Sequence, residues 1–431
     1  MNHPAFAYNN NNNNNNNSNN NSNNHGESNN STDPENMTPF TLDLNPIRTA
    51  TATPGYLAYR VHNFSPAWFS MTMGVGIAGN IIYAFPFPLS TISSRSGLHN
   101  VGLGIIIADM VIFALFLALL TARYCVHGAR REWNEGQGMF FGCIPMGFCT
   151  IVNVVSNRWS SIAGYAMWWV AVAAAIGVTA AVGTHGVSSG RKQGMTEVTA
   201  NMILPIVSLV VAASTGGVVA TNPDFPQGLK ASTLVVSLLM WGCGNGLALL
   251  LMAVYLCRLV ISGLPGKGII ISNLLFVGPM GQGAYGIFNL ADVFVSVFER
   301  PIQEDPASIS ELSLIRQFAG SAPILASFVA ITFVAVGLFW ITLTALAILF
   351  RTGPPHEFNQ SFWSLTFPIG TMTMAWFQMG VVFESTTFKV IGSVFGAFVF
   401  GSVLGCTIAS IKYGLLGDDL FKQAEEQMSR A

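Results

Sequence analysis

Charged side chains are scarce in this sequence of 431 residues. Asp, Glu, Lys and Arg together make up 9% of it, hydrophobic residues make up 51%, and the mean hydropathy is +0.50. Soluble globular domains carry about 25% charged residues, because water must solvate their surfaces. The composition therefore excludes an ordinary water-exposed surface and indicates a protein embedded in a lipid bilayer.

A concentration of positive charge is also absent. The net charge is −1, and the 19 Lys and Arg residues form no basic cluster. Nucleic-acid binding needs a basic face that neutralises phosphates, so the sequence excludes a nucleic-acid partner. The six cysteines lie in or beside apolar runs without the close spacing of metal or redox sites, and we interpret them as small buried hydrophobic residues. We predict no metal and no cofactor.

Sequence motifs of enzymes are missing or out of context. No Walker motif for nucleotide hydrolysis is present. The stretch Gly281–Gly286 fits the GxGxxG pattern of dinucleotide-binding proteins, but that pattern requires a preceding strand, and this stretch lies inside an apolar run. We predict that the protein is not an enzyme.

The beginning of the chain differs in composition from the rest. Asn fills almost every position from Asn9 to Asn24, and no basic segment leading into an apolar one marks a secretory signal. Such a segment has too few apolar residues to form a core. We predict a disordered cytosolic tail over residues 1–62, a transmembrane domain over 63–413 and a cytosolic tail over 414–431.

Beyond Trp68 the sequence contains ten apolar runs close to the roughly 20 residues that a helix needs to cross a bilayer. Backbone amides in lipid have no water to bind, so each crossing is predicted to be helical. The runs are 68–87, 98–122, 139–156, 162–184, 198–220, 231–256, 269–290, 322–350, 362–383 and 390–411. Ten helices would place both termini on one side of the membrane.

The distribution of Lys and Arg predicts which side that is. Thirteen of these residues fall on the side of the termini and six on the other. Positive charge accumulates on the cytosolic side of membrane proteins. We therefore predict a multi-pass plasma-membrane protein with both termini in the cytosol.

Proline distinguishes the odd-numbered runs from the even ones. Runs three, five, seven and nine contain Pro145, Pro205, Pro279 and Pro368, while the even runs contain only Pro323, in a first turn. An interior proline removes a backbone hydrogen bond and bends the helix, which favours a position beside a wet cavity. The pattern predicts five helical hairpins, each with a kinked inner helix and a straighter outer helix. Ordinary membrane-helix kinks are the alternative.

Even-numbered runs carry glycine spacings that permit close helix packing. The GxxxG pairs are Gly242 with Gly246, Gly392 with Gly396, and Gly401 with Gly405. The spacing leaves open whether these faces pack within one subunit or between subunits.

No Lys or Arg lies near the middle of any run, so a path for anions would rely on helix dipoles, freed amides and hydroxyl groups. The candidate hydroxyls are Ser70, Thr72, Ser208, Ser214, Thr215, Thr366 and Thr371. Asp109 is the one clearly intramembrane carboxylate. It is either a structural hydrogen-bonding residue on an outer helix or a protonatable functional group.

Several motifs resemble the tellurite-resistance/dicarboxylate transporter family over roughly residues 63–413. The first span, Asn63–Ser70 followed by Met73–Ile77, and the ninth, Trp363–Pro368, are similar to that family and to plant guard-cell anion channels. The first motif departs from the family pattern at Val75, where a small hydroxyl residue is expected. Two further pairs of motifs resemble the fungal sulfite efflux branch, namely 203–207 with 213–217, and 263–265 with 278–283.

The resemblance implies ten helices as five hairpins around a central pore, in a homotrimer with one pore per subunit. It also implies an aromatic gate at Phe367, for which a structural role in packing is the alternative. The implied function is export of sulfite or bisulfite from the cytosol. The alternatives are a permease for malate or other C4-dicarboxylates, a gated small-anion channel, and a membrane receptor or scaffold.

Overall fold

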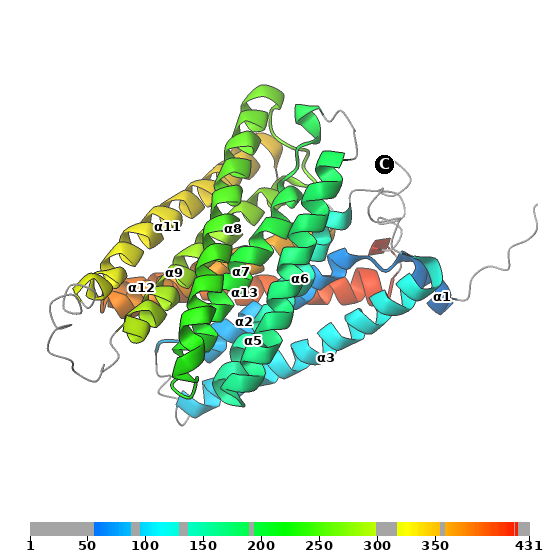
Figure 1. Ribbon diagram of the computed structural model, residues 1–431. Helices are drawn as coiled ribbons and strands as arrows, with labels where there is room; N and C mark the ends of the chain where they lie inside the picture. The colour runs from blue at the N-terminus through cyan, green and yellow to red at the C-terminus, as the bar shows by residue number, and fades with distance from the viewer. Residues whose placement is uncertain are drawn as a thin grey trace, which may run out of the picture. The chain divides into compact units, whose positions relative to one another are not determined.

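The computed structural model describes residues 56–87, 95–128, 137–188, 194–298, 317–353, 358–417 and 419–420. All regular secondary structure in these segments is helical, which confirms the predicted all-α class (Figure 1). The predicted tails lie outside the described residues, except for residues 56–62, 414–417 and 419–420.

Each of the ten apolar runs coincides with a helix. The helices are α2 (Phe69–Tyr83), α3 (Arg95–His127), α5 (Cys143–Arg158), α6 (Ser161–Ser188), α7 (Leu204–Thr221), α8 (Gln227–Ser262), α9 (Val277–Phe298), α11 (Ala322–Ala347), α12 (Phe367–Val382) and α13 (Thr386–Ser410). A short helix, α1 (Tyr56–Asn63), precedes them and was not predicted.

Seven helical stretches of the described chain are long and apolar enough to cross a membrane. They are Gly97–Val126, Gln137–Arg158, Ser161–Ser188, Ala200–Thr221, Gln227–Ser262, Gln317–Arg351 and Thr386–Leu415. Helices α2, α9 and α12 are not among them, and α2 and α12 have only 15 and 16 residues. Other helices bury most of α2 and α12. Irregular backbone beside a short helix is tolerated there, because lipid does not reach it. Crossing by all ten helices stays a prediction.

The helices form an inner and an outer set. Helix α2 packs against α5, α5 against α7, α7 against α9, α9 against α12, and α12 against α2, which closes a ring. The outer helices α3, α6, α8, α11 and α13 each pack against the ring, and α6, α7 and α8 run as neighbours (Figure 1). Large apolar side chains on the outer helices, such as Val111, Leu239 and Phe328, are 65–69% exposed, as expected of a lipid-facing surface.

Close approach of the inner helices depends on small residues. At Gly281 on α9, a methyl group would lie 2.5 Å from the backbone nitrogen of Met372 on α12. No side chain fits at that separation without moving one helix. The glycine therefore sets how closely α9 and α12 pack, by the same small-residue packing that operates between membrane helices in general.

The prolines lie at the starts of inner helices rather than inside them. Pro145, Pro205, Pro279 and Pro368 stand second or third in α5, α7, α9 and α12. A 3₁₀ segment precedes each helix, namely η2 (Gln137–Gly142), η4 (Ala200–Ile203), η5 (Ile270–Phe276) and η8 (Gln360–Leu365). The predicted kinks are therefore not confirmed, because a proline in the first turn of an α-helix leaves no intrahelical hydrogen bond unmade.

The 3₁₀ segments gather at one end of the ring. Segment η2 contacts η4, η4 contacts η5, and η5 contacts η8, while η1 (Pro66–Trp68), which leads into α2, contacts η2. All five inner helices therefore begin at the same end of the ring. We call this set of segments the collar.

Candidate functional site

Predicted site hydroxyls lie buried at contacts between inner helices. Thr72 on α2 faces Gly147 on α5, Ser214 on α7 faces Gly286 on α9, and Thr366 precedes α12 and faces α2. Thr371 on α12 donates to the carbonyl of Gly278 on α9 at 3.2 Å. The predicted hydroxyls, which come from the first, fifth and ninth spans, thus lie at contacts between neighbouring inner helices.

Most of these hydroxyls already have a hydrogen-bond partner in their own helix. Each donates to the carbonyl three residues earlier: Ser70 to Ala67 (2.7 Å), Thr72 to Phe69 (2.9 Å), Ser208 to Pro205 (2.6 Å), Thr366 to Trp363 (2.7 Å) and Thr371 to Pro368 (2.7 Å). Ser and Thr satisfy backbone carbonyls in this way at helix starts and distortions. Their O–H groups are therefore occupied, and residue type alone could not show this.

Ser214 and Thr215 on α7 are the exceptions among the predicted hydroxyls. Both residues are fully buried, and no hydrogen bond of acceptable geometry reaches Ser214 Oγ or Thr215 Oγ1. The Cys149 thiol of α5 lies next to Thr215. A buried hydroxyl without a partner is costly, since its desolvation is not repaid by a hydrogen bond. Among the predicted hydroxyls, these two are therefore the ones that no backbone carbonyl of the described residues binds.

Phe367 is the first residue of α12 and only 2% exposed. The next residue, Pro368, and Val207 of α7 would each lie 3.9 Å from a methyl group placed on Gly278 of α9. The starts of α7, α9 and α12 therefore meet beside Phe367, just inside the collar. The side chain of Phe367 is buried where α12 begins.

Asp109 on α3 is fully buried, and neither carboxylate oxygen has a hydrogen-bond partner. Its Oδ2 would lie 2.8 Å from a methyl group at Gly76 on α2, and Thr150 Oγ1 of α5 would lie 2.1 Å from it. Gly76 therefore leaves the space in which an outer-helix carboxylate meets the contact between two inner helices. The choice between a structural and a protonatable role for Asp109 stays a prediction.

Two residues that sequence reasoning missed belong to the same contact. Asn80 on α2 donates through Nδ2 to the carbonyls of Gly76 (2.8 Å) and Thr150 (3.0 Å), joining α2 to α5. Thr150 Oγ1 donates to the Gly147 carbonyl at 2.7 Å. Asn80 is the only amide side chain in the first span, a signal that could have identified it.

A second polar cluster, also missed, supports the collar from outside. Tyr255 on α8 donates its hydroxyl to Asn273 Oδ1 on η5 at 2.6 Å, and its ring packs against Phe276 and Trp340. Arg258, one turn further along α8, donates to the Gly263 carbonyl at 2.9 Å. These contacts fix η5 against the outer helices α8 and α11.

The chain is similar to known membrane transport proteins. Residues 63–411 match the voltage-dependent anion channel family. A sulfite efflux pump of Arthroderma benhamiae is 31% identical over 350 residues, covering 79% of this chain and 88% of that protein. The sulfite efflux pump of Candida albicans is 28% identical over 86% of this chain and 76% of that protein. A malic acid transport protein of Schizosaccharomyces pombe is 21% identical over 79% of this chain and 76% of that protein.

Proposed function

Because this chain belongs to the voltage-dependent anion channel family, we propose that it exports sulfite or bisulfite from the cytosol across the plasma membrane. We propose sulfite rather than malate on the basis of one observation. Relatives named sulfite efflux pumps are 26–31% identical to this chain, whereas the relatives named for malic acid transport are 21% identical.

The proposed path runs through the ring of α2, α5, α7, α9 and α12, and the outer helices separate it from lipid. The proposed five hairpins are α2 with α3, α5 with α6, α7 with α8, α9 with α11, and α12 with α13, and the members of each pair pack on each other. Burial supports this assignment, since almost every residue of α7 and α12 is covered. In α6 and α13 only one face is covered.

Phe367 is the proposed gate. Its burial among the starts of α7, α9 and α12 is what a ring closing a narrow path requires. Farther from the collar along α7, the hydroxyl groups of Ser214 and Thr215 would donate hydrogen bonds to the anion in place of water. Without a fixed cation along the path, the anion would be held weakly and released quickly.

The membrane potential can supply the driving force. If the termini are cytosolic, an interior-negative potential of 100 mV favours exit of a monovalent anion by about 2.3 kcal/mol. Efflux then needs no nucleotide hydrolysis.

The orientation has its own test, because Asn36 begins an N-x-T sequon that only an exoplasmic tail would expose to glycosylation. A glycosidase-sensitive mass shift at Asn36 would contradict the orientation.

The function itself is tested by reconstituting the purified full-length protein into liposomes loaded with sulfite, malate or chloride. Mildly alkaline buffer suppresses neutral sulfur dioxide, which crosses lipid unaided, and protein-free liposomes give the background. We expect sulfite to leave faster than malate. Faster malate exit would favour the dicarboxylate permease, and no anion flux at all would favour a receptor or scaffold. Single-channel current steps would identify a gated channel.

A homotrimer is proposed for the assembled protein. Methyl groups placed on Gly242 and Gly246 of α8, or on Gly401 and Gly405 of α13, would meet no atom within 4 Å. These two GxxxG faces therefore have room for another helix, whereas Gly392 and Gly396 already pack against α12 and α2. The mass of the detergent-solubilised complex tests this: a monomer or dimer would contradict it.

Asp109 is proposed to bind and release a proton. An isolated carboxylate buried without a cation or hydrogen bond is strongly disfavoured, so its charge must depend on the neighbouring helices. Helix α2 offers no charged side chain to it, and α5 offers only Arg158, at its far end. The other titratable groups on α1, α3 and α5 are Tyr56, Tyr59, Arg60, His62, Arg95, His99, Arg123, Tyr124, Cys125, His127, Cys143 and Cys149.

A further inference from the structure

Three glycines of α9 each contact a different neighbouring helix. A methyl group on Gly281 would lie 2.5 Å from a backbone nitrogen of α12. A methyl group on Gly286 would lie 2.9 Å from Ser214 Cβ on α7, and one on Gly283 would lie 2.6 Å from a side-chain oxygen of the outer helix α8. These contacts fix which way each face of α9 points.

Gln282 stands among these glycines and points into the ring. Successive residues of a helix are rotated by about 100°. Helix α12 therefore lies to one side of Gln282, where Gly281 points, and α7 lies to the other side, where Gly286 points. Because α7 and α12 are the neighbours of α9 in the ring, the direction between them is the ring interior.

Gln282 also lies between the two groups proposed for the path. Gly278, one turn earlier, lies beside Pro368, which directly follows the proposed gate. Gly286, one turn later, faces Ser214. An anion that crossed by the proposed path would therefore pass Gln282 after the gate and before the hydroxyl groups of α7.

The amide of Gln282 has no hydrogen bond to any residue that the structure describes, although only 4% of the residue is exposed. A buried amide without a partner is costly, because its desolvation is not repaid. Two other amides of the ring are engaged: Asn80 donates to the carbonyls of Gly76 and Thr150, and Asn289 donates to the carbonyl of Tyr285 at 3.1 Å. A ligand inside the ring would give Gln282 the partner that the protein does not.

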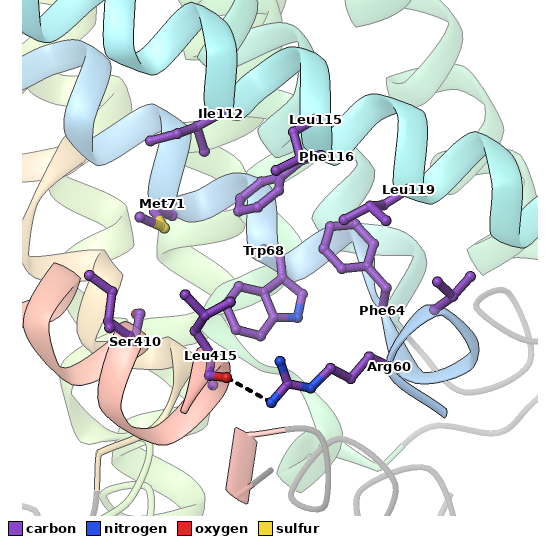
Figure 2. Close-up of a pocket in the computed structure, with 13 residues that line it drawn as sticks. Arg60, Phe64, Trp68, Met71, Ile112, Leu115, Phe116, Leu119, Ser410 and Leu415 are labelled. Carbon is purple, nitrogen blue, oxygen red and sulfur yellow. Dashed lines mark hydrogen bonds between the residues drawn. The ribbon is translucent and has the colours of Figure 1, made fainter. Parts of the chain in front are cut away.

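The outside of the bundle gives a contrast. Figure 2 shows an apolar groove beside α3, in which Arg60 donates to the Leu415 carbonyl at 2.7 Å. That guanidinium is engaged within the protein, whereas the Gln282 amide remains available for a ligand.

We propose that Gln282 binds the transported anion, donating its Nε2 hydrogens to the oxygens of sulfite or bisulfite. A carboxamide offers two N–H donors without a fixed charge. It can therefore replace water around the anion and still release it, as passage through a path requires. This inference rests on the proposed function, which names the anion.

The test measures binding and flux separately, with the purified full-length protein. Binding is the rise of Tm with sulfite concentration in detergent, corrected with gluconate at equal ionic strength, and it does not require transport. Flux is sulfite exit from liposomes per folded protein. Gln282→Met keeps the length of the side chain and removes both polar atoms. It should raise the sulfite concentration for half-maximal stabilisation about tenfold or more, since it removes a hydrogen bond to a charged group, and lower sulfite flux.

Two further measurements separate binding from a structural role. Without sulfite, Gln282→Met should be at least as stable as the unmodified protein, because it removes an unpaired buried amide. Gln282→Glu keeps the size of the side chain but replaces the NH₂ donors with an oxygen, so it should lose the same binding.

Asn245 on α8 provides the matched control. It touches α9 at Gly283, on the outside of the ring, and its Nδ2 donates to the Trp241 carbonyl at 2.8 Å. Asn245→Leu also removes a buried amide beside α9. It should leave sulfite binding and flux per folded protein unchanged.

The proposal is overturned if sulfite stabilises the unmodified protein no more than gluconate does. It is equally overturned if sulfite stabilises the Gln282 variants as strongly as the unmodified protein, or if Asn245→Leu loses as much binding as they do. Sulfite binding that depends on Gln282 without any sulfite flux would instead refute the proposed export and leave the binding site standing.

Discussion

Helices α6 and α7 are neighbours of similar apolar composition, yet they are buried in opposite ways. In α7, 16 of the 18 residues are buried, whereas α6 buries only Ser161, Gly164, Trp168, Ala171, Val172 and Ala175. Those six recur at helical spacing and form one face. In water such a helix would carry polar residues on its other face, but in lipid both faces are apolar, so hydropathy does not separate inner from outer helices.

The largest expected effect comes from filling a contact between two inner helices. Gly281→Leu should prevent folding, because its side chain would overlap the α12 backbone near Met372. Overpacking typically costs 1–3 kcal/mol and more where backbone blocks it. The size-exclusion profile and the thermal stability of the purified protein measure this loss of folding.

The control for this substitution lies on the outer helix. A methyl group on Gly177 of α6 meets no atom within 4 Å, so Gly177→Leu should leave both measurements unchanged. If the two variants behaved alike, the distinction between inner and outer helices would lose its basis.

The second prediction separates a gate from a packed aromatic residue. Phe367→Ala should increase chloride or sulfite flux per folded protein in liposomes several-fold, because the proposed plug is removed. Phe276 is a suitable comparison: it also lies at a 3₁₀-to-α junction, but it packs against Tyr255 and Trp340 with ring centroids 4.8 and 4.6 Å away.

Phe276→Ala should lower stability, since emptying a packed aromatic site costs about 3–5 kcal/mol, without raising flux per folded protein. Unchanged or reduced flux in a stable Phe367→Ala protein would remove this residue from the gate.

The third prediction concerns the one acidic side chain that reaches the ring from the outer set. Chloride is the appropriate anion, because its charge does not change with pH. An ionised Asp109 repels anions and a protonated one does not, so flux should fall as pH rises. Asp109→Asn, which resembles the protonated form, should keep the higher flux at every pH. A variant with the original pH dependence would show that Asp109 is not the titrating group.

The smallest effect is expected within α7 itself. Ser214→Ala removes an unpartnered hydroxyl and should lower sulfite flux a few-fold with little change in stability. Ser208→Ala, six residues earlier, removes a hydroxyl already bound to the Pro205 carbonyl. Its flux should therefore change less. Equal flux in both variants would show that Ser214 does not contact the anion.

Sequence reasoning placed the helices well because the bilayer fixes their length and composition. Even the short run at 139–156 proved to be a helical stretch, formed by η2 and α5. Residue type could not show that Thr72 and Ser208 are bound within their own helices while Ser214 is not. That difference depends on which carbonyls the local backbone leaves available.

The residues that surround Asp109 could not be predicted from the sequence either. Its proximity to Gly76 and Thr150 joins three helices that are far apart in the chain, and no local pattern encodes such a meeting. The prolines were informative in the sequence. They mark the inner helices, but they stand in the first turns of these α-helices. Proline is tolerated at both places, so its presence alone cannot distinguish them.

The collar makes the two ends of the ring unlike. Five helices that all start there point their backbone N–H groups toward one mouth and their carbonyls toward the other. An anion that crossed by the proposed path through the ring would meet the attractive N–H end first in one direction and last in the other. The same protein in a symmetric bath of anions should consequently rectify, passing more current under one sign of voltage than under the opposite sign.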